Sequence, residues 1–171
     1  IYRYSHEDLE KIKELKLDIL IRCGTGILKG DILNVTKFGI ISFHHGDNRY
    51  NRGGPSGFWE TYLNWPTTGF IIQKLTEELD GGNILYRGNI KTSALWHENN
   101  AQLLLKSNFF IFKILKYIST NNSLPAIENS SLYYNNIFKQ PNAYILLRYI
   151  FNEYLFILKY KIYSRFNIKE K

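Results

Sequence analysis

Short apolar runs that alternate with segments of helical periodicity are the feature that most limits the fold of this chain. Two such runs, 18–21 and 39–43, are each followed closely by a loop of glycine or polar residues. A third run covers 68–75, and a shorter one covers 84–86. Runs of this length between helical segments are typical of buried strands, so we expect an α/β sheet with helices packed on it.

The segments around these runs have helix signals. Ser5 precedes acidic residues, which predicts an N-cap and a helix that ends near residue 16. Segment 27–33 is predicted to be a short helix or turn, and 58–63 part of a helix. Segment 98–118 has Leu, Phe and Ile at helical spacing, which predicts a long helix.

The character of the chain changes after residue 118. Polar, loop-like residues fill the segment from 119, and 143–166 is helical, aromatic and interrupted by charged residues. We therefore expect a first unit over 1–118 and a linker with a helical aromatic and basic extension over 119–171. The charges argue against a membrane span, which needs about 20 mostly apolar residues. The expected role of 143–166 is packing on a domain or partner outside this sequence, with an interfacial helix as the alternative.

Composition narrows the class of protein. The chain has 171 residues, of which 44% are hydrophobic, and this content supports a packed core and excludes a wholly disordered chain. Its net charge is +7, but the basic residues are scattered and form no compact stripe. We therefore expect a solvated basic surface and no nucleic-acid partner, with an anionic substrate or a lipid surface as the alternative.

The single cysteine, Cys23, excludes an internal disulfide, and no Cys/His cluster has the spacing of a structural zinc site. A cytoplasmic location is therefore expected, and no signal peptide is visible. The sequence has no methionine and opens on a helix that leads directly into a strand. We take this as a sign of a longer protein whose sheet would be incomplete at the N-terminus of this piece.

Two loops hold the candidate chemistry. His44-His45-Gly46-Asp47 follows one apolar run, and a turn that contains Asp80 follows another. A histidine titrates near neutral pH, and a carboxylate beside it can hold its tautomer or share its proton, so the pair is a candidate acid/base site. These histidines and carboxylates could also bind zinc or iron. Adjacent side chains of an extended segment point to opposite faces, however, so we expect no metal.

Four blocks in this region carry a resemblance. They are Gly39-Ile40-Ile41-Ser42-Phe43-His44, Arg52-Gly53, Thr68-Gly69 and Leu79-Asp80-Gly81-Gly82. In order and spacing they resemble the formyltransferase family, which includes methionyl-tRNA, glycinamide ribonucleotide and sugar N-formyltransferases. The resemblance covers about 18–86, roughly the second half of the family's catalytic domain. It implies a Rossmann-like formyltransferase fold, with the site beyond the carboxyl ends of the strands.

The resemblance also implies roles for single residues. His44 matches the family's catalytic histidine and Asp80 its catalytic aspartate. The implied reaction moves a formyl group from 10-formyltetrahydrofolate to a primary amine. His44 would donate a hydrogen bond to the formyl oxygen, and Asp80 would take a proton from the amine. Without the resemblance, His44 would be a structural histidine and Asp80 a brace for its own turn.

The implied donor pocket uses backbone groups. Gly26, Ile27 and Leu28 match the family stretch that lines the pterin ring, and Leu79 with Asp80 would close the other side of the ring. A glycine suits a flat ring that approaches the main chain closely.

One position departs from the family pattern. The family's catalytic asparagine falls on Ser42, whose hydroxyl donates one hydrogen bond and reaches less far. Residues 46–49 also differ from the family loop. This predicts either an altered acceptor pocket in an active branch or a loss of catalysis. His45 and Asp47 are candidates to compensate, and Arg49 is a candidate to bind a phosphate or carboxylate of the acceptor.

The expected function is therefore formyl transfer to an amino sugar or another small amine. Two alternatives remain open. One is a catalytically weak or inactive module that binds a ligand or partner within a larger protein. The other is hydrolysis of the formyl donor to formate, which needs only water in place of the amine.

Overall fold

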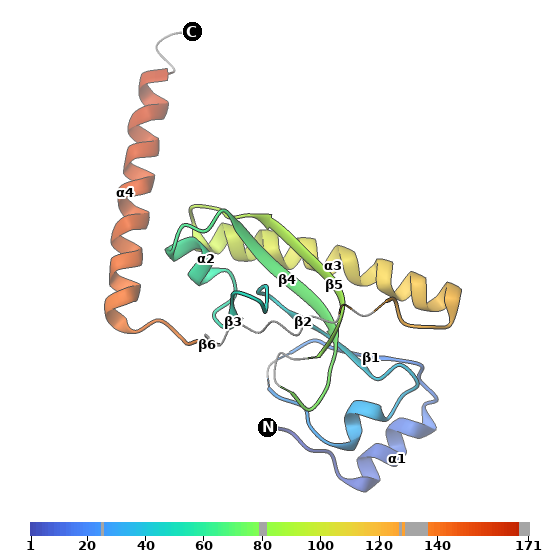
Figure 1. The fold of residues 1–171 in the computed structure, drawn as a ribbon. Coiled ribbons are helices and arrows are strands. Elements are labelled where there is room, and N and C mark those ends of the chain that lie inside the picture. Colours follow the sequence, from blue (N-terminus) through green and yellow to red (C-terminus); the bar gives the residue numbers. More distant parts are fainter. Residues whose placement is uncertain (25, 79–81, 127, 129–136, 168–171) are drawn as a thin grey trace.

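The structure is a computed structural model that describes residues 1–24, 26–78, 82–126, 128 and 137–167 (Figure 1). Its elements, in chain order, are α1 (His6–Glu14), β1 (Leu20–Arg22), the 3-10 helix η1 (Asp31–Asn34), β2 (Ile40–His44), β3 (Arg52–Gly53), α2 (Phe58–Tyr62), β4 (Thr67–Lys74), β5 (Asn83–Lys91), α3 (Trp96–Asn121), β6 (Ile137–Phe138) and α4 (Ala143–Asn167). Each predicted strand and helix is present near its predicted position, so the expected α/β class is confirmed.

Four strands form a mixed sheet in the order β1-β2-β4-β5. β1 and β2 are parallel, and the other two pairs are antiparallel. Strand β5 is longer than predicted because it pairs with β4 along the whole of that strand, from Thr67↔Lys91 to Lys74↔Asn83. The polar residues Arg87 and Asn89 interrupt its apolar pattern, so only the pairing reveals its length.

Helix α3 lies along one face of this sheet (Figure 1). The main core lies between them and is formed by Phe38, Ile41, Ile72, Leu85, Ile111, Ile114 and Ile118. The helical members recur at intervals of three and four, as expected for one buried helix face. On the other side of the sheet, Leu9 from α1 and Ile32 and Leu33 from η1 pack against Ile40.

The alternation of side chains along β2 positions the candidate site. Ile41 and Phe43 face α3, because both belong to the core on that side. Ile40 belongs to the opposite cluster, so Ser42 and His44 point to the face away from α3. The two predicted catalytic positions on β2 therefore share one face of the sheet.

The predicted N-cap at Ser5 is confirmed. Ser5 Oγ accepts a hydrogen bond from the Asp8 backbone N–H at 3.2 Å, and the Asp8 carboxylate accepts one from the Ser5 backbone at 3.3 Å. This reciprocal capping box satisfies two backbone donors at the start of α1.

The segment after α3 contributes a short strand and a long helix. β6 pairs in parallel with β3 inside the segment that we expected to be a linker. The α4 helix stands away from the sheet for much of its length (Figure 1). Its contacts with the rest include Tyr149, whose ring lies 5.4 Å from that of Phe58, and Glu153, whose Oε1 lies 3.4 Å from His97 Nδ1. None of the helices that the structure describes is both long enough and apolar enough to cross a bilayer.

Candidate functional site

His44 lies at the end of β2 and is held by the loop that follows it. Its Nε2 donates to the Asn51 carbonyl at 3.1 Å, which places a proton on Nε2 because a carbonyl can only accept. The loop turns back because Tyr50 and Asn51 both donate backbone hydrogen bonds to the Asp47 carbonyl at 2.8 Å. A Cβ at Gly46 would lie 2.9 Å from His44 Nε2, so only glycine permits this close approach.

A buried carboxylate adjoins this histidine. Glu60, on α2, is 1% exposed, and its Oε1 accepts a hydrogen bond from Asn51 Nδ2 at 2.8 Å. Burial raises the pKa of Glu60, although the bond from Asn51 and the charge of His44 oppose this change. His44, Asn51 and Glu60 thus form a connected series on the face away from α3.

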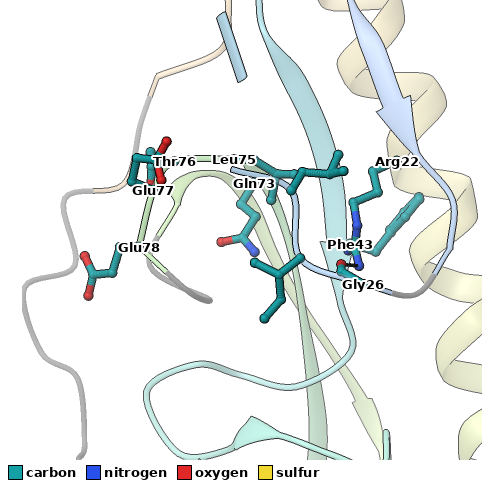
Figure 2. A pocket seen from close by; sticks show the side chains of 10 residues that line it. Arg22, Gly26, Phe43, Gln73, Leu75, Thr76, Glu77 and Glu78 are labelled. Carbon is teal, nitrogen blue, oxygen red and sulfur yellow. Dashed lines mark hydrogen bonds between the residues drawn. The ribbon is translucent and has the colours of Figure 1, made fainter. Parts of the chain in front are cut away.

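Ser42 is covered by an arginine from the neighbouring strand. Arg22 pairs with Ser42 in the parallel register and donates from Nη1 to Ser42 Oγ at 3.1 Å. Its Nη2 donates to the Gly26 carbonyl, a bond drawn as a dashed line in Figure 2. The Ser42 hydroxyl donates to the Phe43 carbonyl at 3.2 Å, so a guanidinium supplies the outward donors at this position.

The predicted donor-pocket residues meet in one cavity. Gly26, Ile27 and Leu28 line it together with residues 75–78. Figure 2 shows Gly26 across from Thr76 and Glu77. Leu79 and Asp80 lie outside the described residues, which stop at Glu78 just before them. The cavity has a volume of about 90 Å³. The Ile27 carbonyl already accepts a bond from the Tyr2 backbone at 2.7 Å, so the Leu28 backbone is the part directed away from Tyr2.

A second, polar cavity lies on the same face and has a volume of about 200 Å³. Asn51 and Glu60 form part of its wall, and Asp47, Arg49 and Trp65 also line it. His44 is therefore one hydrogen bond from this cavity, through Asn51, just as Ser42 is one hydrogen bond from the first cavity, through Arg22.

Two predicted acceptor-binding residues, Asp47 and Arg49, bind each other. Arg49 Nη2 lies 2.6 Å from Asp47 Oδ2, and Arg87 donates to Asp47 Oδ1. Burial opposes ionisation of Asp47, but the hydrogen bonds and charges of the two arginines outweigh it and hold the pKa of this carboxyl below its ordinary value. The charge of Asp47 is therefore already balanced inside the protein.

Comparison with known proteins agrees on the fold. No family model and no curated protein matches the sequence. Among solved structures, a protein of Mycobacterium tuberculosis described as a likely sugar N-formyltransferase has 16% identity and a TM-score of 0.62, with 84% of this chain and 66% of that chain covered. The chain has the formyltransferase fold.

Two further structures have the same fold. The methionyl-tRNA formyltransferase of Clostridium thermocellum has 15% identity and a TM-score of 0.57, with 81% of this chain and 59% of that chain covered. A sugar 3-N-formyltransferase, solved in the presence of dTDP and 5-N-formyl-THF, has 14% identity and a TM-score of 0.52, with 72% and 47% covered. This chain therefore spans less than two thirds of the length of each of these three proteins.

His45 lies on the other face of the sheet from His44. Its Nε2 is 3.0 Å from Ser107 Oγ on α3, and its ring stacks on Phe43 with centroids 5.8 Å apart. Burial and, secondarily, the charge of His44 lower the pKa of His45 to about 4. The described residues contain no group of three or more His, Cys, Asp or Glu side chains arranged to hold a metal ion.

The sequence analysis did not single out four residues of this site: Arg22, Asn51, Glu60 and Arg87. Arg22 ends an apolar strand, and Arg87 lies in a strand whose extent the sequence did not show. Glu60 had a usable signal, because it is the one charged residue in segment 58–63, whose other residues, apart from Thr61, are apolar or aromatic. A glutamate is rarely fully buried unless it has a partner, and the structure shows that Glu60 is buried.

Proposed function

We propose that this chain is a formyltransferase-like enzyme that moves a formyl group from 10-formyltetrahydrofolate to a primary amine such as an amino sugar. The observation that supports it most is the cavity lined by residues 26–28 and 75–78, whose wall includes Arg22, the hydrogen-bond partner of Ser42. The solved sugar 3-N-formyltransferase of the same fold was crystallised with 5-N-formyl-THF, which supports a folate donor here.

The residues of the first cavity fit a pterin ring in kind. Leu28 and Leu75 offer apolar contacts, and the Leu28 backbone, Gln73 and Glu77 offer hydrogen-bonding groups for the ring edge. Its volume of about 90 Å³ is too small for a bicyclic ring. Binding therefore requires Arg22 or the segment before residue 79 to move aside.

The folate would supply the formyl carbon that an amine attacks. In this proposal, His44 donates its Nε2 proton to the formyl oxygen, and Arg22 supplies the second donor that the asparagine gives in the family. The His44 tautomer inferred from its contact carries the required proton, which must leave the Asn51 carbonyl, 3.1 Å from Nε2, to reach the formyl oxygen. Asp80 takes a proton from the amine and passes it to N10 of the folate, so that the bond between N10 and the formyl carbon breaks and tetrahydrofolate leaves. With Leu79, Asp80 also closes the far side of the pterin.

A binding module without turnover is the second candidate. The specific observation in its favour is that the Ser42 hydroxyl donates to its own strand, so the position of the family's asparagine offers no free carboxamide donor. Loss of one oxyanion donor typically lowers the rate about 100-fold or more. This candidate binds the folate but transfers nothing.

The proposal also covers the domain division, the acceptor, the location and the partners of the protein. The division into a catalytic unit over 1–118 and an extension over 119–171 stays a prediction. A small amine is the proposed acceptor, His45 is left without a substrate role, and Asp47 and Arg49 form the rim of the acceptor site. We place the activity in the cytoplasm and expect no nucleic acid and no metal to take part.

Calorimetry with 5-formyltetrahydrofolate tests the proposal. We expect saturable binding to the wild-type protein, weaker binding to Asp80→Ala, and unchanged binding to the matched control His97→Ala, whose side chain is 70% exposed. His44→Ala should bind the folate but lose formyl transfer. A folded protein that does not bind the folate would contradict the proposal.

Turnover separates the candidates. Formyl transfer from 10-formyltetrahydrofolate to an amine, lost in Arg22→Ala, supports the enzyme and the role of Arg22. Folate binding without transfer selects the binding module. Formate release without any acceptor selects hydrolysis of the donor.

A further inference from the structure

Two buried oxygen atoms in the polar cavity lack a donor. Glu60 Oε2 and Asn51 Oδ1 have no hydrogen-bond partner among the residues that the structure describes, and both side chains are 1% exposed. Both residues line the cavity of about 200 Å³. Native proteins rarely bury acceptors without donors because each such atom costs free energy. These atoms therefore mark a place for a ligand that brings N–H groups.

The balance of charge around the cavity specifies that ligand further. The Asp47 carboxylate is already paired with Arg49 and Arg87. Glu60 has no ion-pair partner among the described residues, and its one hydrogen bond comes from the neutral amide of Asn51. Arg87 also binds Glu128, so the three carboxyl groups of Asp47, Glu60 and Glu128 share two guanidinium groups, and this group of side chains lacks one positive charge. Burial raises the pKa of Glu60, as expected for a buried carboxyl group that has no cation beside it.

The size and walls of the cavity limit what carries the charge. A volume of about 200 Å³ holds an ammonium group and part of a ring. Trp65 and Tyr50 offer aromatic surfaces at its wall, and Thr67 and Asn89 offer further polar groups. Aromatic and polar walls of this kind suit a ring that has both CH faces and hydroxyl groups. An amino sugar has this chemistry.

We propose that this cavity binds the acceptor amine as a primary ammonium, with Glu60 Oε2 and Asn51 Oδ1 accepting its N–H bonds. Glu60 then takes one proton, so that the carboxylate becomes a carboxylic acid and the ammonium becomes a neutral amine with a free electron pair. This assignment rests on the proposed function, because only there is the bound amine the acceptor of the formyl group. Binding of the amine itself does not depend on the folate. It gives Glu60 a catalytic role distinct from that of Asp80, which would take the second proton after attack on the formyl carbon.

Calorimetry with glucosamine and N-acetylglucosamine tests this assignment, because the two sugars share a ring and differ in the ammonium. We expect the wild type to bind glucosamine and to bind N-acetylglucosamine weakly or not at all. Glu60→Gln should weaken glucosamine binding about ten- to a hundredfold, the loss expected for a charge-assisted hydrogen bond. Glu14→Gln, on the exposed side of α1, is the matched control and should change nothing.

Glu60→Asp keeps the negative charge, and it replaces Glu60→Gln in the experiment if that variant does not fold. It should retain the preference for glucosamine with reduced affinity. Equal binding of both sugars by the wild type, or unchanged glucosamine binding by folded Glu60→Gln, would overturn the assignment. If the protein binds glucosamine selectively but does not bind the folate, the proposed function is contradicted and the assignment of this cavity is supported. If formyl transfer from the folate occurs and its KM for the amine is unchanged in Glu60→Gln, the assignment of this cavity is contradicted and the proposed function is supported.

Discussion

His44 and His45 are neighbours in the chain but have different surroundings and different chemistry. His44 meets the loop carbonyl of Asn51 and lies near Glu60. His45 donates to Ser107 Oγ, because that hydroxyl gives its own proton to the Leu104 carbonyl at 3.0 Å. The alternation of a β-strand separates the two rings, so a proton on one is not shared with the other.

The buried position of His45 predicts a pH-dependent stability. The pKa of His45 is about 4 in the folded protein and 6.5 when unfolded, so the unfolded chain binds more protons between these values. Stability should therefore fall as the pH drops from 6.5 towards 4, by about 2 to 3 kcal/mol from this group. Urea unfolding of the wild type and of His45→Gln, which keeps a donor for Ser107, measures the difference.

Glu60, whose pKa burial raises above 4.5, titrates in the same window with the opposite sign, but it does so equally in both proteins. The lowered pKa of Asp47 removes stability only as the pH falls below 3.8, and it does so equally in both proteins. Parallel stability curves for wild type and His45→Gln between pH 6.5 and 4 would show that His45 titrates normally in the fold.

At the scale of elements, α3 is tied to the sheet by a polar anchor near its start. Asn99 is fully buried, and its Nδ2 donates to the Gly57 carbonyl at 2.9 Å and to Thr68 Oγ1 at 2.8 Å. Its Oδ1 accepts from the Ser93 backbone at 3.1 Å. One side chain therefore links α3 to β4, to the residue before α2 and to the turn after β5.

Asn99→Ala should be strongly destabilising. The substitution leaves buried partners such as the Gly57 carbonyl unsatisfied and opens a small cavity, which together cost about 2 to 4 kcal/mol. Gln102→Ala, one turn later and exposed, is the control and should change stability by less than about 0.5 kcal/mol. Chemical denaturation gives both values, and similar midpoints for the two variants would contradict the anchor.

At the scale of the whole molecule, α4 is the element least accounted for. Tyr149 is 7% exposed and ties α4 to the body of the protein, because its hydroxyl oxygen accepts a hydrogen bond from the Trp96 backbone N–H at 2.9 Å. Beyond this contact, large apolar side chains point outward on several sides of the helix, including Leu147, Phe151, Tyr154, Tyr160 and Tyr163. An exposed apolar surface of this extent is typical of an interaction site.

We expect α4 to drive self-association of the chain in solution. Replacing Leu147, Phe151 and Tyr154 with serine removes apolar surface that is 62–66% exposed and should shift the protein towards monomer. Sedimentation velocity over a range of concentrations measures this shift. Serine at Leu15 and Leu63, which are exposed elsewhere, is the control; a wild type that stays monomeric at every concentration would contradict the expectation.

The sequence alone was sufficient to predict the helices and strands of the fold. Apolar runs and helix caps are local patterns, so the strands, the long helices and the cap at Ser5 could be read from them. The four blocks in register also pointed to the formyltransferase fold. Residues 26–28 line a cavity, and their role in holding a pterin ring stays a prediction. The assignments of Leu79 and Asp80 lie outside the described residues.

Only the tertiary structure decided which side chains meet. Arg22 reaches Ser42, Asn51 reaches Glu60, and Arg87 reaches Asp47 across 20, 9 and 40 positions of the chain. No periodicity connects such pairs, because strand register and the turn after β2 bring them together. The burial of Glu60 could not be predicted from the sequence either, because an acidic residue in a helix is ordinarily exposed and only the packing of α2 buries this one. Local patterns record how each segment folds, whereas charge balance and cavities depend on contacts between distant segments.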